Sequence, residues 1–207
     1  MIELPTFVQV VDFLGTFAFA ISGIRLASAK RFDFFGAYVV GLTTAVGGGT
    51  MRDLILGISP FWTTTPFYLV STALALLWVV LFGKKIIRQN NTWFIFDTLG
   101  LALFTVSGLE KTLSYGFPWW VAIVMGAVTG AAGGVFRDVF INEVPLIFRK
   151  EIYALACLIG GAVYILIYTL FTQNTALCGI IAGLTVMLVR VLAVRFKLHL
   201  PILKGED

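Results

Sequence analysis

Six charged residues stand inside stretches of sequence that are otherwise apolar. They form two sets that recur 85 residues apart: Asp12, Arg52 and Asp53, then Asp97, Arg137 and Asp138. Charged residues within a membrane usually face a bundle interior or water, are paired, and mark ion or substrate pathways. We therefore predict that these side chains are pore-lining or gating charges. Structural pairs that only lock the bundle are the alternative.

The depth of each residue along its apolar stretch predicts which charges pair. Asp12 and Arg52 are expected near one membrane surface, and Asp97 and Arg137 near the other. Arg52 and Asp53 are neighbours on one helix, and neighbouring helical side chains do not face each other. The sequence therefore predicts two ion pairs between helices and none between adjacent residues.

Glycine runs precede both Arg-Asp pairs. Gly47, Gly48 and Gly49 stand before the first, and Gly133 and Gly134 stand at the equivalent positions before the second. Adjacent glycines weaken a helix and are common kink points. Interruptions at corresponding positions of two repeats point to a binding or conduction site, so we predict hinges that line a pore. Close helix packing through small residues is the alternative.

Four hydroxyl residues accompany these sets. Ser22 and Ser107 recur at the far ends of the stretches that contain the first aspartates, and Thr44 and Thr129 precede the glycines. Hydroxyl and carbonyl oxygens can replace the hydration of an ion in a narrow path. These residues are predicted to line the pore, with plain helix packing as the alternative for the serines.

Catalytic and cofactor chemistry finds no support in the sequence. The chain has no Ser/His/Asp arrangement, metal-ligand spacing or nucleotide-binding loop. Its single histidine is His199, and its two cysteines, Cys157 and Cys178, stand inside apolar stretches. We therefore expect no enzyme, no cofactor and no bound metal apart from a transported ion.

The composition requires a membrane protein. The 207 residues are 59% hydrophobic and 13% charged, and their mean hydropathy is +0.96. A spanning helix needs about 20 apolar residues, and the alternating pattern of a membrane β-barrel is missing. The sequence predicts one all-α membrane domain over residues 1–207 with seven spans, at about 7–25, 35–56, 66–83, 93–110, 119–140, 152–171 and 176–194.

Six of these spans form an internal repeat. Residues 12–60 align with 97–145 without a gap, with 16 identities in 49 positions. An odd number of spans per repeat forces the second copy to enter the membrane from the opposite side. The expected architecture is therefore a three-helix repeat at 7–83, an inverted repeat at 93–171 and an extra helix at 176–194, with a permeation path between the repeats.

These motifs carry a resemblance to a known family. Gly-Gly-Gly-Thr-Met-Arg-Asp at 47–53 and Gly-Gly-Val-Phe-Arg-Asp at 133–138, in a three-plus-three-plus-one order of spans, resemble the prokaryotic trimeric intracellular cation channels. The similarity covers essentially residues 5–197. It implies a homotrimer with one potassium-permeable pore per subunit, formed mainly by spans one, two, four and five and kinked at the glycines.

The resemblance leaves the transport mechanism open. The same bacterial sequences are also grouped under a "glycine transporter" label, and channels and carriers can share an inverted-repeat fold. A secondary transporter of a small solute such as glycine is the alternative to a cation channel. Lipid regulation in the animal members is tied to a Lys-Glu-Val motif, whereas this chain has Glu110-Lys111 and no such triplet.

The basic residues predict the orientation of the chain. Of the basic residues outside the spans, one set of alternate loops, with the C-terminal tail, holds ten, and the other set holds only Lys111. The protein is expected to be a multi-pass protein of the cell inner membrane. By the positive-inside rule, its N-terminus is expected outside and its C-terminus in the cytoplasm. This placement explains the net charge of +4 without a nucleic-acid partner, and it allows contacts with anionic lipids. The basic set is Lys30, Arg31, Lys84, Lys85, Arg88, Arg149, Lys150, Arg195, Lys197 and Lys204.

We predict that a fluorescent-protein fusion after Asp207 is bright and that an alkaline phosphatase fusion at the same point is inactive, because the tail is cytoplasmic. Activity and fluorescence of the paired fusions in cells measure the orientation. An active phosphatase fusion would overturn either the span count or the orientation.

Overall fold

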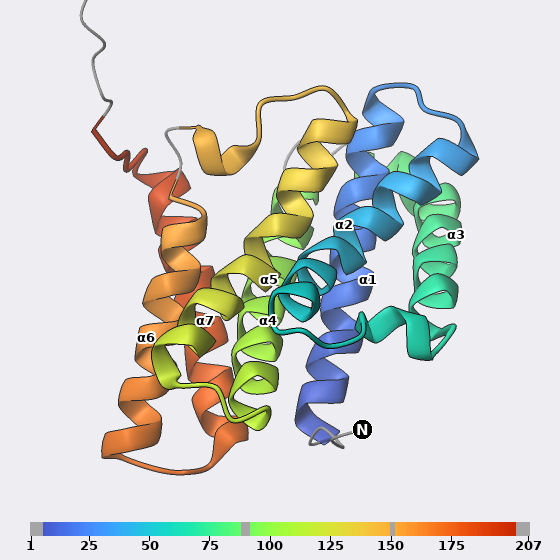
Figure 1. The fold of residues 1–207 in the computed structure, drawn as a ribbon. Helices are drawn as coiled ribbons and strands as arrows, with labels where there is room; N and C mark the ends of the chain where they lie inside the picture. The colour runs from blue at the N-terminus through green and yellow to red at the C-terminus, as the bar shows by residue number, and fades with distance from the viewer. Residues whose placement is uncertain (1–5, 88–91, 150–151, 202–207) are drawn as a thin grey trace, which may run out of the picture.

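The computed structural model describes residues 6–87, 92–149 and 152–201. These residues form seven α-helices and two short 3-10 helices (Figure 1). The predicted seven-span architecture is thereby confirmed. Three of the basic residues used to predict the orientation, Arg88, Lys150 and Lys204, lie outside the described residues. The elements are α1 Thr6–Ala29, α2 Phe34–Ile55, η1 Phe61–Thr64, α3 Phe67–Ile87, α4 Thr92–Ser114, α5 Trp119–Phe140, η2 Leu146–Phe148, α6 Ala154–Leu170 and α7 Thr175–Arg195.

The helices form two inverted repeats and one additional helix. In Figure 1, α1 and α4 run in opposite directions, as do α2 and α5. Each repeat has the same order of elements, with a 3-10 helix, η1 or η2, after its second α-helix. Helix α1 packs against α4 and α2 packs against α5, while α7 packs on α4 and α6. The interface between the repeats is therefore built from α1, α2, α4 and α5.

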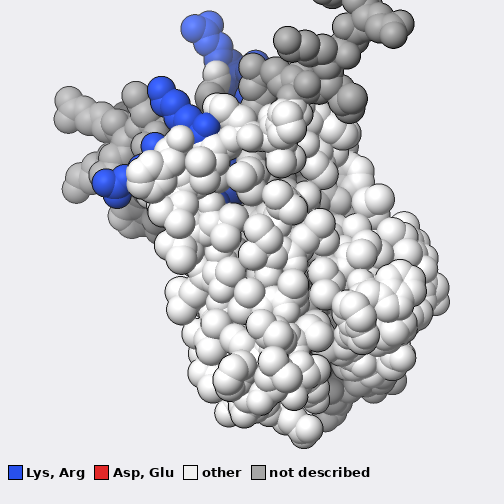
Figure 2. Space-filling model, turned by 90° about the vertical axis from the view of Figure 1, so that its left-hand side faces the viewer, with Lys and Arg blue, Asp and Glu red and all other residues white. Residues whose placement is uncertain are grey.

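Charged and uncharged surfaces lie at different ends of the face shown in Figure 2. Lys and Arg side chains gather at one end of the face shown in Figure 2, and the rest of that face is uncharged. The turn between α1 and α2, the segment after α5 and the end of α7 lie together at this end, which we call the basic end (Figure 1). Among the described residues, five helices meet the length and hydropathy of a membrane span, and α3 and α6 contain shorter apolar stretches. The uncharged surface away from the basic end is the part of the molecule that a bilayer would cover.

The backbones of α2 and α5 cross closely at the glycine runs. A Cβ atom at Gly48 would collide with the carbonyl oxygen of Thr129, and a Cβ at Gly133 would collide with that of Thr44. Both helices are continuous α-helix through their glycines, so neither is an unwound break. The close packing of helices thus accounts for Gly48 and Gly133, and a bend in the continuous helices stays a prediction.

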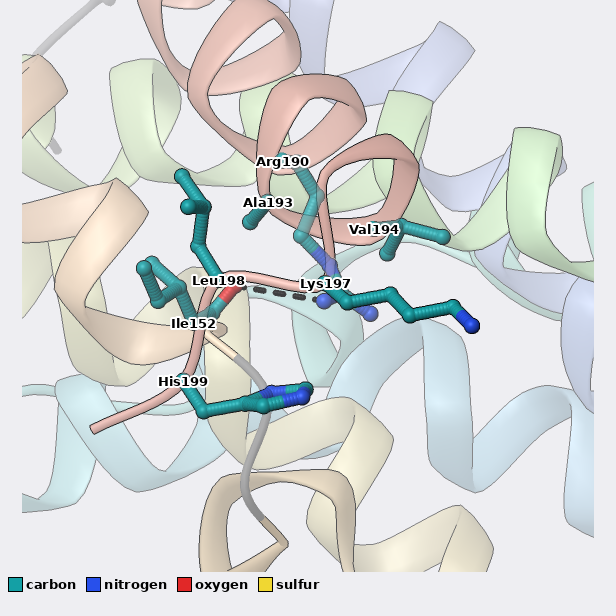
Figure 3. A pocket seen from close by; sticks show the side chains of 7 residues that line it. All are labelled: Ile152, Arg190, Ala193, Val194, Lys197, Leu198 and His199. Atoms are coloured by element: carbon teal, nitrogen blue, oxygen red, sulfur yellow. Dashed lines mark hydrogen bonds between the residues drawn. The ribbon is translucent and has the colours of Figure 1, made fainter. Parts of the chain in front are cut away.

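Helix α7 is attached to the second repeat by a buried arginine. Arg190 donates a hydrogen bond from Nη1 to the carbonyl oxygen of Ile152 at 3.2 Å. Its guanidinium lies over the rings of Tyr153 and Phe94, at 4.9 and 5.3 Å from the ring centroids. The same side chain lines a cavity of about 190 Å³ at the basic end, beside His199 (Figure 3). Stacking on aromatic faces stabilises a desolvated guanidinium, which explains how a fully buried arginine joins α7 to the start of α6.

We predict that Gly48→Ala and Gly133→Ala each lower the melting temperature of the detergent-solubilised protein by about 2–10 °C, because overpacking costs about 1–3 kcal/mol. The added methyl group meets backbone atoms, which cannot rotate away as a side chain can. Thermal unfolding monitored by circular dichroism measures the shift.

Gly183→Ala on α7 is the matched control for this prediction. The nearest atom to a Cβ at Gly183 is Cγ2 of Val106 at 3.7 Å, an ordinary contact distance. Alanine is favoured over glycine in a helix by about 1 kcal/mol, so this variant should melt at the wild-type temperature or above it. Equal shifts for Gly48→Ala and Gly183→Ala would contradict the close crossing.

Candidate functional site

A buried ionic cluster joins α4 and α5 on the side of the basic end. Nη1 of Arg137 forms an ion pair with Asp97 and donates to Oγ of Ser22 at 3.0 Å. Nε of the same guanidinium donates to Asp138 at 2.9 Å. All four side chains are buried. One arginine therefore connects α1, α4 and α5, and we call Asp97, Arg137 and Asp138 the inner cluster.

Two further groups hold the carboxylates of the inner cluster in place. The hydroxyl of Tyr153 donates to Asp97 at 3.3 Å, and the backbone N–H of Leu146 in η2 donates to Asp138 at 3.0 Å. Hydrogen bonds to charged groups are stronger than neutral ones. The 3-10 helix and the segment before α6 thus position the acidic side chains.

A related cluster lies at the end of α2. Nε of Arg52 donates to Asp53 at 2.9 Å, and the backbone N–H of Phe61 in η1 donates to the same carboxylate at 2.9 Å. Lys111, in the last turn of α4, reaches Asp53 Oδ1 at 3.0 Å. The ring of Phe61 lies 5.8 Å from the Arg52 guanidinium and 5.5 Å from the Lys111 ammonium. We call Arg52, Asp53, Lys111 and the nearby Asp12 the outer cluster.

Asp12 on α1 has neutral partners. The hydroxyl of Tyr68 on α3 donates to it at 2.7 Å, and Oγ of Ser107 on α4 donates at 2.9 Å. This carboxylate therefore links α1 to α3 and α4 through hydroxyl groups. Charge-assisted hydrogen bonds of this kind compensate part of the desolvation of a carboxylate.

One of the two expected interhelical ion pairs is present. Asp97 and Arg137 form it, whereas the structure pairs Arg52 with Asp53 instead of Asp12. The expectation that adjacent Arg and Asp residues point apart was wrong in both repeats, because Arg137 also contacts Asp138. The separation rule applies to Cβ directions, but the long arginine side chain bends so that its guanidinium reaches the next residue.

The four expected hydroxyl residues take two different roles. Ser22 and Ser107 join the clusters, as partners of Arg137 and Asp12. Thr44 and Thr129 each donate to a carbonyl of their own helix at 2.6 Å. Oxygen lone pairs of both threonines remain available to accept bonds, so a role in lining a path stays a prediction.

Sequence reasoning missed Tyr68, Tyr153 and Lys111 as members of the clusters. The two tyrosines are 85 residues apart, so extending the repeat alignment past its last proline would have found them. Lys111 was counted as a loop residue, but it is 8% exposed and ends α4 as a partner of Asp53. The position 85 residues earlier is Leu26, so no repeat signal marks this lysine.

The two clusters differ in formal charge. The inner cluster contains two carboxylates and one guanidinium, a net charge of minus one. The outer cluster contains two carboxylates and two cations, a net charge of zero. Among the described residues, Asp97 Oδ2 and Arg137 Nη2 are buried without a hydrogen-bond partner. Leaving a buried polar atom unsatisfied costs about 1–3 kcal/mol, and a buried water molecule would remove that cost.

A cavity of about 250 Å³ opens beside the inner cluster toward the basic end. Its lining includes Arg137 and Asp138 together with Lys30, Glu143 and Arg149. Nζ of Lys30 lies 2.6 Å from Glu143, and Arg149 lies 3.1 Å from the same carboxylate. The hydrogen bond from Lys30 lowers the pKa of Glu143, so this exposed pair is ionised at neutral pH. Residues 6–87, 92–149 and 152–201 contain no group of three or more His, Cys, Asp or Glu side chains that would hold a metal.

Comparison with known proteins places the chain in a family. A family model described as "Glycine transporter" matches residues 9–84 and again residues 94–169. The structure of a trimeric intracellular cation (TRIC) channel orthologue from Rhodobacter sphaeroides superimposes with a TM-score of 0.88 at 32% identity, covering 94% of this chain and 100% of that one. The chain belongs to the family of the prokaryotic TRIC channels. A second TRIC cation channel structure gives a TM-score of 0.84 at 33% identity, over 96% of this chain and 98% of that one.

Curated relatives and a distant structure extend this result. The inner membrane protein YadS of Escherichia coli is 40% identical over 195 residues, 92% of this chain and 93% of YadS. A membrane protein of Vibrio cholerae is 38% identical over 197 residues, 92% of this chain and 80% of that protein. A TRIC channel from C. elegans shares 16% identity with a TM-score of 0.60, a likeness in fold. The TRIC family therefore accounts for nearly the whole chain.

We predict that Asp97 and Arg137 are energetically coupled and that Asp12 and Arg52 are coupled more weakly. Removing one partner of a buried pair costs about 3–5 kcal/mol because it strands the other charge, so Asp97→Asn with Arg137→Gln should recover part of the single-variant losses. Free energies of unfolding in detergent, arranged as double-mutant cycles, give the two coupling energies.

The coupling expected for Asp97 and Arg137 is about 1–3 kcal/mol. The Asp12→Asn and Arg52→Gln cycle serves as the internal comparison, because Asp12 bonds to Tyr68 and Ser107 rather than to Arg52. A coupling for the Asp12 cycle as large as for the Asp97 cycle would contradict the arrangement of the two clusters.

Proposed function

We propose that the chain is a potassium-permeable channel for monovalent cations, with one path in each subunit between the inverted repeats. The observation that carries the proposal is the inner cluster, where two carboxylates share one guanidinium and two of the three members, Arg137 and Asp138, line a cavity that opens toward the basic end. Intramembrane charges of this kind mark ion pathways. The TRIC structures to which the chain is similar are described as cation channels.

The family membership supports a proposal for the assembly, and the basic residues support one for the orientation. The Rhodobacter sphaeroides orthologue is described as a trimeric channel, and YadS is named an inner membrane protein. We propose a homotrimer in the cell inner membrane, with the basic end in the cytoplasm by the positive-inside rule. Potassium or sodium ions and membrane lipids are its remaining partners.

The path runs along the α2–α5 crossing and past the two clusters. Gly47, Gly48, Gly49, Gly133 and Gly134 allow the crossing to be tight, and a bend there would change the width of the path. The inner and outer clusters lie on either side of the crossing because the repeats are inverted. A cation that passes between the repeats meets the Asp97 carboxylate only when Arg137 moves away from it.

Glycine transport is the second candidate, because the matching family model is described as a glycine transporter. A zwitterion needs one site for its carboxylate and another for its ammonium group, and the Arg and Asp residues of the inner cluster provide both charges. Planar-bilayer recording and proteoliposome uptake of labelled glycine, with the same purified protein, separate the candidates. Unitary potassium currents support the channel, whereas saturable glycine uptake without currents would replace the proposal by the carrier.

We predict that Asp97→Asn lowers the potassium conductance about tenfold or more, because it removes the net negative charge of the inner cluster. A unit charge about 5 Å from an ion is worth about 3 kcal/mol at an effective dielectric constant of about 20, and 1.4 kcal/mol is tenfold. Single-channel recording in symmetric potassium chloride measures the change.

Asp33→Asn is the matched control for the conductance measurement. Asp33 lies at the basic end, where it caps α2 by accepting a hydrogen bond from the Gly36 N–H at 2.7 Å. Asparagine caps a helix as well as aspartate, so this variant removes one negative charge outside the proposed path and should conduct normally. Equal losses in Asp97→Asn and Asp33→Asn would exclude a specific role for the inner cluster.

A further inference from the structure

An exposed ion pair connects the two repeats at the basic end. Lys30 belongs to the turn between α1 and α2 of the first repeat, and Glu143 belongs to the segment between α5 and η2 of the second repeat. Their side chains are 43% and 40% exposed, and the Nζ–Oε1 distance is 2.6 Å. This contact joins two connecting segments that lie outside the α-helices of the bundle.

Repeat symmetry does not produce this ion pair. The positions equivalent to Lys30 and Glu143 at the other end are Tyr115 and Ile58, which carry no charge. Arg149, the second partner of Glu143, corresponds to Thr64. The chain therefore has a charged connection between the repeats at the basic end and none at the equivalent place opposite.

The connection lies over the cavity that adjoins the inner cluster. Lys30, Glu143 and Arg149 line the same space of about 250 Å³ as Arg137 and Asp138. The cavity therefore offers a cation a route between the basic end and the inner cluster. The two exposed side chains that meet across it are therefore in a position to restrict access.

We infer that the Lys30–Glu143 ion pair is a gate at the inner mouth of the path. This inference rests on the proposed channel function. In the state described here the pair is formed and the mouth is narrowed by it. When Lys30 moves away, Glu143 keeps its contact with Arg149, and the cavity gains a carboxylate that no longer faces an ammonium group. The open mouth is thus both wider and more attractive to cations.

The physical character of the pair suits a gate. Both side chains are flexible and partly in water, so the contact breaks without uncovering apolar core. An ion pair between exposed groups is weak and is screened by salt. Opening therefore needs little energy, and the fraction of open channels should rise with ionic strength on the side of the basic end.

The decisive experiment locks the gate covalently. Lys30→Cys and Glu143→Cys are combined, and a short bis-methanethiosulfonate reagent links the two thiols while single-channel currents are recorded in potassium chloride. The native Cys157 and Cys178 are fully buried and are not expected to react. We expect the currents to disappear on crosslinking, verified by intact mass, and to return after reduction.

Single variants test the same gate without crosslinking. Lys30→Gln should raise the open probability by up to about fivefold, the equilibrium worth of an exposed ion pair. Arg31→Gln is the matched control, because Arg31 adjoins Lys30 and its side chain forms no hydrogen bond or ion pair with the described residues, while its backbone N–H donates to Ser28 at 3.0 Å. It removes the same charge from the same turn and should leave the open probability unchanged.

The outcomes separate this inference from the channel proposal. Currents in the wild type that persist unchanged in the crosslinked protein would overturn the gate and leave the channel standing. An absence of currents in the wild type, the crosslinked protein and the reduced protein would overturn both. Equal increases for Lys30→Gln and Arg31→Gln would reduce the effect to surface charge and also overturn the gate.

Discussion

A charged group inside a bilayer has to be compensated by protein, because lipid offers it neither water nor counter-ions. This constraint determines much of the arrangement of the helices. Arg137 is bonded by side chains from α1, α4 and α5, and Asp12 by side chains from α3 and α4. No helix can compensate these groups by itself, so the buried charges hold several helices in fixed relative positions.

The close crossing of α2 and α5 places the clusters on either side of a common centre. Gly48 lies against the backbone of the other repeat at Thr129, and Gly133 lies against it at Thr44. The Arg-Asp pairs follow their glycines by four and five residues, about one helical turn. Because α2 and α5 run in opposite directions, one turn beyond the crossing leads toward opposite membrane surfaces. The glycines and the charges therefore belong to one structural unit.

The fold is nearly symmetric, but its chemistry is not. The Arg-Asp contact and the backbone hydrogen bond from the following 3-10 helix occur in both repeats with almost equal lengths. Lys111 joins the outer cluster, whereas its repeat counterpart, Leu26, adds no charge to the inner cluster. Arg137 contacts Asp97, whereas the equivalent Arg52 does not contact Asp12, which bonds to hydroxyl groups instead. A path between such repeats has two ends that differ in charge, although the two halves that form it are similar in fold.

The sequence determined the seven spans, their three-plus-three-plus-one order and the inversion of the second repeat. Hydropathy, helix length and an odd number of spans suffice for these conclusions, because each depends on local composition or on counting. It also located the six charged residues of the two repeated motifs, five of which are buried, since such residues stand out in an apolar helix. It identified Asp97 and Arg137 as partners from their depth.

Only the tertiary structure decided which atoms meet. Depth along a helix limits the partners of a side chain but not its rotamer, so Arg52 reaches Asp53 although the two Cβ atoms point apart. Lys111, at a helix end, has a sequence position equally suited to a loop, and its contact with Asp53 depends on how α4 packs near α2. The pair of Lys30 and Glu143 joins residues 113 positions apart that lie outside the aligned charged motifs. Its formation follows from the folding of the two repeats against each other, which brings their connecting segments together at one end of the molecule.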